Sequence, residues 1–170
     1  ATLFTGSGDP EFWPHQWAIP WQVVLAIVTS QFFEYWLHRL CHTNPWLWRL
    51  HATHHSPTRL YFFNAGRFHP LDTALSVTVS LLTLALTGAG ELVLLLVATW
   101  VLVHGLFQHC NIHLRLGPLN WVFSMAELHR WHHSKVLEEA NNNYGNNILL
   151  WDIIFGTVYW PSDRDASADI

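Results

Sequence analysis

Apolar runs separated by breaks that contain proline, glycine or asparagine divide the chain into predicted helices. The first run covers residues 21–37 and continues without interruption into a pair of histidines, so one helix is expected to cross the membrane and carry both. Asn44-Pro45 ends this helix. Residues 46–55 then restart as an amphipathic helix with Trp on one side and His on the other, and we expect it to lie at the membrane interface.

A second apolar block, residues 73–107, is interrupted only at residues 87–90, which contain two glycines. This pattern predicts a helical hairpin that dips through the bilayer and returns. Residues 56–72 are expected to form a folded connection, and residues 138–161 an Asn-rich loop followed by an apolar segment. The predicted fold is therefore all-α: a membrane helical bundle made of a transmembrane helix, a hairpin and a cytosolic-side helical cap that carries the histidines.

The composition supports a membrane protein. The chain is 51% hydrophobic and only 12% charged, about half the usual charged share, and it contains 11 Trp, which concentrate where hydrocarbon meets water. Its 170 residues are expected to form a single domain, 1–170. The first residue is Ala rather than Met, so an upstream span or targeting segment is left open, and no signal peptide is visible.

The charge distribution predicts topology and excludes one class of partner. A net charge of −4 without a basic cluster argues against nucleic acid. By the positive-inside rule, a multi-pass integral membrane protein is expected with the histidine-bearing segments on the cytoplasmic face. This orientation rests on the basic residues that lie between the first span and the hairpin and on those that follow the hairpin: Arg39, Arg49, Arg59, Arg67, Arg115, Arg130 and Lys135.

Three histidine clusters follow helical spacing: His38 and His42 as HxxxH, then His51, His54 and His55, and His129, His132 and His133, as two HxxHH motifs. Residues three and four apart share a helix face, so each cluster points its imidazoles toward one place. Eight imidazoles exceed what one ion or a zinc site needs, which predicts two metals. Imidazole binds Fe, Zn, Cu and Ni, so ligand type alone does not identify them.

Other polar residues are candidates for supporting roles. One or two of His104, His109 and His113 are expected to complete the site, although a core role for His104 is an equal alternative. His69 either supports the site or pins its loop, and His15, on the opposite side of the membrane, is excluded. Carboxylates that could fix imidazole tautomers, with capping or surface use as the alternative, are Glu34, Glu127 and, more weakly, Asp72 and Asp152.

The two cysteines, Cys41 and Cys110, are interpreted as small packing residues. Both are expected on the reducing side of the membrane, which argues against a disulfide. Direct thiolate ligation of a metal is the minority alternative.

The ordered motifs resemble the fatty acid hydroxylase superfamily, also called the sterol desaturase family. The resemblance covers nearly the whole chain from Glu34 to Pro161 and rests on HRLCH at 38–42, NPWLWRLHATHHS at 44–56, RFHPLD at 67–72, FQHCN at 107–111, ELHRWHHS at 127–134 and NNNYGNNILLWDIIFGT at 141–157. It implies an integral membrane enzyme that holds two non-haem iron ions and uses O2 and two electrons to hydroxylate or desaturate a lipid.

The resemblance also implies a ligand set, which is both the metal site and the catalytic site: His38, His42, His51, His54, His55, His109, His129, His132 and His133. His113 departs from the commoner pattern and is left unassigned. By this resemblance, the chain is expected to lack one or more spans found in longer relatives.

A lipid C–H bond is inert to acid–base groups, so a redox metal is needed. Hydroxylation of a fatty acyl, sterol-like or related lipid ranks ahead of desaturation. Because the chain has no cytochrome, flavin or ferredoxin motif, electrons are expected from a separate partner of the cytochrome or ferredoxin type with its reductase. The apolar tail is expected to reach the metals through a groove lined by Phe32, Phe33, Tyr35, Phe62, Phe63 and Trp100.

Two other function classes are open. A membrane zinc hydrolase would bind zinc and act without O2. A membrane metal transporter or storage protein would need polar groups along a path through the bilayer, and the hairpin interior offers almost none, with Glu91 near its turn.

Overall fold

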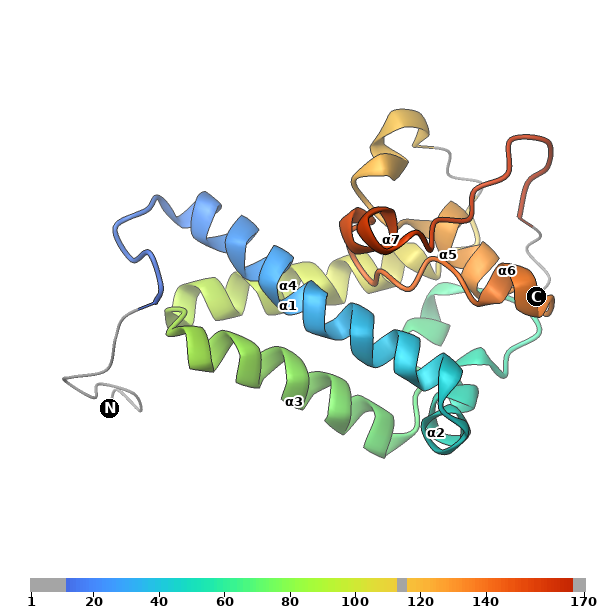
Figure 1. The fold of residues 1–170 in the computed structure, drawn as a ribbon, viewed down its shortest axis with the longest axis horizontal. Coiled ribbons are helices and arrows are strands. Elements are labelled where there is room, and N and C mark those ends of the chain that lie inside the picture. The colour runs from blue at the N-terminus through green and yellow to red at the C-terminus, as the bar shows by residue number, and fades with distance from the viewer. Residues whose placement is uncertain (1–11, 113–115, 167–170) are drawn as a thin grey trace.

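The computed structural model describes residues 12–112 and 116–166, and within these ranges the fold is all-α, as predicted (Figure 1). The described part contains no β-strand, only an isolated bridge between Phe123 and Ile148. The elements are α1 (Ile19–Thr43), α2 (Pro45–His55), η1 (Phe62–Gly66), α3 (Pro70–Thr87), α4 (Glu91–Gln108), η2 (Gly117–Trp121), α5 (Ala126–His132), α6 (Leu137–Ala140) and α7 (Leu150–Phe155).

The junction between α1 and α2 brings two histidine motifs together. As predicted, α1 is one continuous helix that carries the HxxxH pair, and the break falls at Asn44. The Asn44 side chain caps α2 by accepting from the Trp46 and Leu47 backbone N–H groups at 2.9 and 3.2 Å. Pro45 is the first residue of α2, where its missing N–H costs nothing. A single residue, Asn44, therefore separates α1 from α2.

The predicted hairpin is confirmed as α3 and α4. Gly88 ends α3 in the left-handed region, with φ of +82°, and its N–H donates to the Ala85 carbonyl at 3.0 Å. At the other end, α3 begins earlier than predicted, at Pro70, because the His69 Nδ1 accepts from the Leu71 N–H at 3.2 Å and caps the helix. The connection after α2 is shorter for this reason.

Helix α1 packs against both α3 and α4, and the short helices gather at one end with α2 (Figure 1). A hydrophobic cluster fills the opposite end, near the hairpin turn: Trp13, Ala26, Leu84, Val93 and Val97. The inner face of α1 is polar by comparison, with buried Gln22, Ser30, Gln31 and Glu34.

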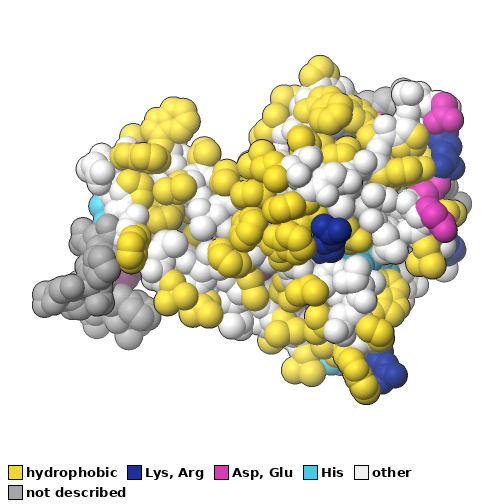
Figure 2. All heavy atoms as spheres, viewed as in Figure 1, with side chains coloured by type: hydrophobic (Ala, Val, Ile, Leu, Met, Phe, Trp, Pro, Cys, Tyr) yellow, Lys and Arg dark blue, Asp and Glu magenta, His cyan; other side chains and the backbone are white. Residues whose placement is uncertain are grey.

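Helices α3 and α4 are long and apolar enough to cross a membrane. Only 11% and 22% of their residues are buried inside the protein, whereas a core helix of a soluble protein is mostly buried. Their outward faces are apolar, with Leu86 and Leu102 73% and 67% exposed. Figure 2 shows hydrophobic side chains over the long helices and most charged side chains at the end with the short helices. These features indicate a membrane protein; a crossing by α1 remains a prediction.

Gly88→Ala is predicted to lower the free energy of unfolding by about 1 kcal/mol, because a Cβ is strained in the left-handed region. The added Cβ would meet Trp13 only at 3.8 Å, so packing is not the cause. The measurement is denaturant or thermal unfolding in a mild detergent. Gly88→Asn is the matched control, since Asn tolerates this conformation, and equal losses in both variants would contradict the backbone explanation.

Candidate metal centre

Nine histidines from α1, α2 and α5 and from the end of α4 converge in two groups. The five-histidine group consists of His38, His42, His51, His55 and His132, and the four-histidine group of His54, His109, His129 and His133. Within each group, one ring nitrogen from every member lies within 4.8 Å of the others. All are buried except His42 and His55, which are half-buried. The nine residues brought together are those singled out from the sequence.

The two HxxHH motifs divide their histidines between the groups. In α2, His51 and His55 join the five-histidine group and His54 joins the other. In α5 the assignment is reversed, with His129 and His133 in the four-histidine group and His132 in the other. Residues i and i+4 therefore serve one group and residue i+3 serves the neighbouring group. The two groups are adjacent and share both helices.

Backbone carbonyls fix the tautomers of several rings. A carbonyl only accepts hydrogen bonds, so the ring nitrogen that faces it carries the proton and the other ring nitrogen presents a lone pair. The Nδ1–H groups donate as follows: His38 to Tyr144 at 2.7 Å, His132 to Asn142 at 2.8 Å, His109 to Gly105 at 2.9 Å and His54 to Arg67 at 3.3 Å. The Nε2 lone pairs of all four rings therefore point inward.

Inward lone pairs face one another in both groups. The Nε2 atoms of His38 and His132 are 3.0 Å apart, and those of His54 and His109 are 3.3 Å apart. Two lone pairs at this distance repel unless a cation lies between them. Burial, and then repulsion from neighbouring histidines, holds the pKa of His54 and of His132 well below the ordinary value, so a proton is a poor candidate. A metal ion is the cation that fits.

The spacing of the nitrogens agrees with metal ligation. In the four-histidine group, four Nε2 contacts close a ring with edges of 3.0–3.3 Å. Imidazole nitrogens bound at about 2.0–2.1 Å to one ion lie about 2.8–3.4 Å apart for right-angled to tetrahedral geometry. In the five-histidine group, the Nε2 atoms of His42, His51 and His55 are buried without a hydrogen-bond partner. Both groups can therefore hold a metal ion.

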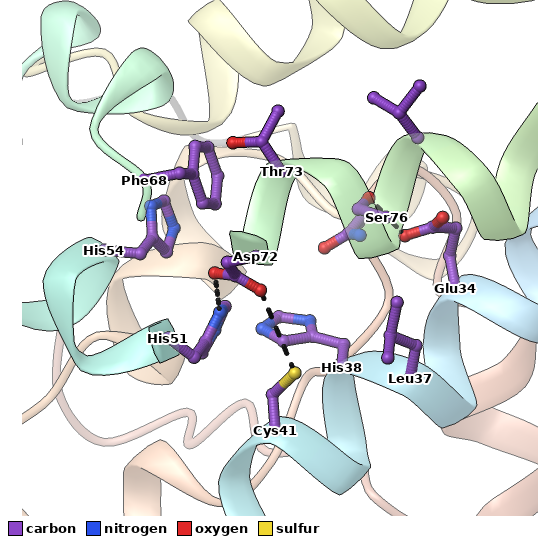
Figure 3. A pocket seen from close by; sticks show the side chains of 12 residues that line it. Glu34, Leu37, His38, Cys41, His51, His54, Phe68, Asp72, Thr73 and Ser76 are labelled. Atoms are coloured by element: carbon purple, nitrogen blue, oxygen red, sulfur yellow. Dashed lines mark hydrogen bonds and ion pairs between the residues drawn. The ribbon is translucent and has the colours of Figure 1, made fainter. Parts of the chain in front are cut away.

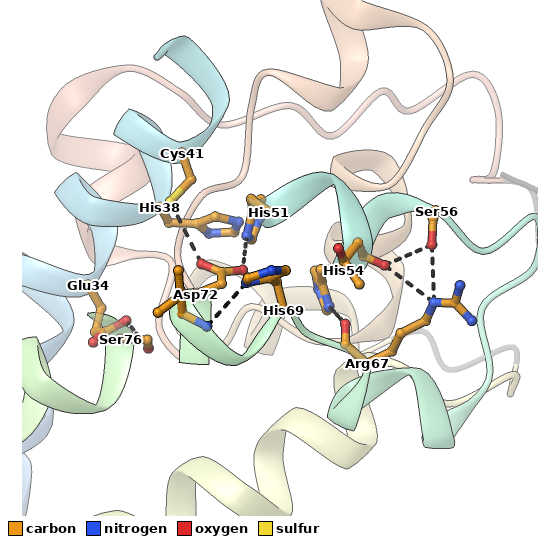
Figure 4. A network of polar contacts seen from close by, with 12 residues as sticks. Glu34, His38, Cys41, His51, His54, Ser56, Arg67, His69, Asp72 and Ser76 are labelled. Carbon is orange, nitrogen blue, oxygen red and sulfur yellow. Dashed lines mark hydrogen bonds and ion pairs between the residues drawn. The ribbon is translucent and has the colours of Figure 1, made fainter. Parts of the chain in front are cut away.

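Of the four carboxylates considered from the sequence, only Asp72 contacts a histidine of either group. Its Oδ2 lies 2.9 Å from the His51 Nδ1, and the Cys41 thiol points to its Oδ1 at 4.0 Å (Figure 4). Asp72 therefore orients the His51 ring with its Nε2 toward the group. The partners of the others are Ser76 and Ser80 for Glu34, Asn120 and Trp160 for Glu127, and Tyr144, Gly145 and Thr157 for Asp152.

The Asn-rich loop supplies two of the orienting carbonyls, which the sequence analysis missed. Asp152 holds this loop by accepting from the Tyr144 and Gly145 N–H groups at 2.8 and 2.7 Å. Asn143 pins it further, donating from its side chain to Leu128 and Tyr159. Carbonyls carry no side-chain signature, so the only available signal was the density of asparagines next to a histidine motif.

The remaining candidates lie outside both groups or outside the described residues. His69 caps α3, so it pins the loop. His104 is buried beside Trp100, with ring centroids 5.3 Å apart, and joins neither group. His15 is exposed at the far end, and His113 lies outside the described residues. Both cysteines, Cys41 and Cys110, are buried and free, in keeping with packing roles.

Two cavities reach the histidines from different sides. The first, of about 120 Å³, lies between α1 and α3 and contacts both groups through His38, His51 and His54 (Figure 3). The second, of about 350 Å³, opens among the short helices beside His42, His55 and His133, with Trp48 and Lys135 in its wall. One side of the centre therefore faces the long helices and the other faces the cap.

None of the six groove residues predicted from the sequence lines the first cavity. Phe32 and Tyr35 face α7 instead, with ring centroids 4.8 Å from Trp151 and 5.3 Å from Phe155. The cavity wall on the α3 side contains Phe68, Thr73 and Val77. A helix presents residues to two neighbours at once, and the sequence did not show which face of α1 met α3.

Comparison with known proteins identifies the family to which the chain is similar. A family model described as fatty acid hydroxylase matches residues 23–157. Ornithine lipid hydroxylase of Rhizobium tropici is 47% identical over 159 residues, which cover 94% of this chain and 48% of the relative. Human alkylglycerol monooxygenase is 29% identical over 155 residues (87% and 33%), and a very-long-chain aldehyde decarbonylase of Oryza sativa subsp. japonica is 28% identical over 147 residues (85% and 54%). The chain thus spans about a third to a half of these relatives. No solved structure matches.

Asp72→Ala is predicted to weaken metal binding about 10- to 100-fold, because His51 loses the acceptor that orients it. Competition with a chelator of known affinity measures the effect. Asp72→Asn keeps an oxygen acceptor and is expected to lose less. If both variants bind metal as tightly as the parent, Asp72 has no orienting role.

Gly145→Ala is predicted to destabilise the protein by about 1–3 kcal/mol and to weaken metal binding, because the added Cβ would lie 2.4 Å from the Ile148 carbonyl oxygen and 2.6 Å from Asp152 Oδ2. The loop must shift, and it carries the carbonyl that orients His38. Unfolding and metal content are measured together. Gly66→Ala, which meets nothing within 4 Å, is the control; a Gly145 variant that behaves like it would contradict the prediction.

Proposed function

The chain belongs to the fatty acid hydroxylase family, and from this premise we propose that it hydroxylates a C–H bond of a membrane lipid with O2 at a pair of histidine-bound iron ions. The observation that carries the proposal is the convergence of nine imidazoles, seven of them buried and two half-buried, in two adjacent groups with lone pairs facing inward. Zinc chemistry does not require two all-histidine sites, whereas oxidation of an inert C–H bond requires a redox metal.

Each group would hold one iron through its ring nitrogens, giving the nine ligands predicted from the sequence: His38, His42, His51, His54, His55, His109, His129, His132 and His133. When bound, the iron pair supplies the two-electron reduction of O2 and the oxidising power for the C–H bond. The protein fixes the ring orientations in advance through backbone carbonyls and Asp72. Burial of the rings keeps bulk water from the reacting carbon.

The first cavity is the proposed place for the part of the lipid that is oxidised. It contacts both groups and lies between α1 and α3, next to the apolar outer faces of the hairpin. A lipid could enter it from the bilayer without crossing water. The domain is proposed to be a multi-pass membrane unit with its metal centre on the cytoplasmic face, as the predicted positions of the basic residues favour.

Electrons are proposed to come from a separate donor of the cytochrome or ferredoxin type with its reductase. The second cavity gives such a donor an approach to the centre, since it opens at the cap and its wall contains His42, His55 and His133. Trp48 lies against this wall, with its ring centroid 5.2 Å from that of His42 and 5.5 Å from that of His55. Lipid and electrons would then arrive from opposite sides.

Metal content and Mössbauer spectra of the purified protein, loaded with iron without O2, test the proposal. About two coupled irons per chain are expected. His54→Ala, from the four-histidine group, and His132→Ala, from the five-histidine group, should each lose the coupling. His104→Ala is the control, because this buried histidine joins neither group.

The activity itself is tested with isotopically labelled O2, an artificial reductant and lipid extracts, with an ornithine lipid as the first pure substrate because the 47% identical relative is named for it. A lipid that gains one labelled oxygen is the expected product, and loss of two hydrogens instead would indicate desaturation. Tightly held zinc, no iron uptake and activity without O2 would refute the proposal in favour of a hydrolase.

A further inference from the structure

We infer that Glu34 makes the first cavity selective for lipids that present a positively charged ammonium group there, rather than a carboxylate or a phosphate. The inference rests on the proposed function and deepens it by naming a substrate class and the residue that recognises it. It starts from the position of Glu34 at one end of the cavity, with His51 and His54 toward the other end (Figure 3).

The Glu34 carboxylate is deeply buried without a basic partner. Its side chain belongs to a residue only 4% exposed, in the interface between α1 and α3. Ser80 donates to one carboxylate oxygen at 2.7 Å and Ser76 to the other at 2.8 Å. Among residues 12–112 and 116–166, no Lys or Arg lies within ion-pair distance of it.

Two serine hydroxyls leave the carboxylate with unused acceptor capacity. A carboxylate offers about four acceptor positions, so about two remain. A buried carboxylate is unfavourable unless a cation or further hydrogen-bond donors compensate its charge. Ionisable groups inside a membrane bundle are rare for this reason, and they usually mark a functional contact. The unused positions are next to space that a ligand can enter.

Apart from the histidines, which would hold the metal ions, the ionisable side chains of the cavity have one sign of charge. Two carboxylates, Glu34 and Asp72, line it, and the described lining contains neither Lys nor Arg. Asp72 is engaged by His51 and Cys41, so Glu34 is the carboxylate left to meet a ligand. A carboxylate or phosphate group beside Glu34, at the end away from the metal ligands, would be repelled at short range in a medium of low dielectric constant. An ammonium would gain an ion pair and hydrogen bonds.

The distance to the metal centre allows an anchoring role. Glu34 precedes His38 by four residues on α1, about 6 Å along the helix axis. An ammonium held by Glu34 therefore lies away from the bound metals, while the neighbouring carbons reach the histidine end. The cavity, at about 120 Å³, holds a short segment of a lipid rather than a whole one.

Short amphiphiles test the selectivity directly. Hexylamine, 1-hexanol and hexanoate are titrated by calorimetry into the iron-loaded, full chain in nanodiscs, without O2 or reductant. Hexylamine is expected to bind at least about tenfold more tightly than hexanol, and hexanoate most weakly. Glu34→Gln is expected to remove the preference for the amine. Equal affinities, or a preference for hexanoate caused by the bound metals, would overturn the inference.

Two controls separate recognition from a structural role of Glu34 as a clamp between helices. Ser76→Ala combined with Ser80→Ala removes the serine hydrogen bonds but keeps the carboxylate, and the amine preference should persist. Glu91→Gln removes one negative charge at the exposed start of α4, far from the cavity, and should change nothing. If Glu34→Gln lowers only the unfolding temperature and leaves the amine preference intact, the carboxylate is a clamp and the inference fails.

Because binding is measured without turnover, this inference and the proposed function fail separately. Retained amine selectivity without hydroxylated product would leave the cavity assignment standing and refute the reaction. Hydroxylation of lipids that carry only anionic groups would support the reaction and overturn the selectivity.

Discussion

Repulsion between inward-facing imidazole lone pairs is the constraint on which the rest of this structure depends. His38 with His132, and His54 with His109, are held at 3.0 and 3.3 Å with their protons committed to carbonyls on the opposite side of each ring. Such a core is unfavourable without a cation and becomes the most strongly held part of the molecule with one. The Asn-rich loop, the short helices and the ends of the long helices around this core therefore keep the rings in place.

The crosswise division of the HxxHH motifs ties the two groups into one unit. Since α2 and α5 each contribute to both groups, neither group can form unless both helices are docked. Docking of α5 in turn needs the Asn-rich loop, because that loop supplies the carbonyls facing His38 and His132. Segments from both halves of the chain must therefore be docked together before either group is complete.

The helices and the clustering of the histidines could be predicted from the sequence, because each depends on local periodicity. The continuous α1, the break at Asn44 and the hairpin at Gly88 were predicted for this reason. The residues that orient the histidine rings could not be predicted from the sequence, because their positions depend on tertiary contacts. Asp72, ranked below Glu34 from spacing alone, is the carboxylate that contacts His51, since it lies across the helix interface rather than along α1. The absence of the predicted groove residues from the lining of the first cavity has the same origin.

The division of polarity along α1 separates an apolar end from a histidine-bearing end. One end of the helix packs into an apolar cluster with α3 and α4, and the other carries two histidines of the five-histidine group. Between them Glu34 and its two serines form a buried polar step next to the cavity. Under the proposed function, a lipid that entered this cavity from the bilayer would place its polar group beside Glu34 and a neighbouring C–H bond beside the histidines. Selectivity and reactivity would then lie about one helical turn apart on the same helix.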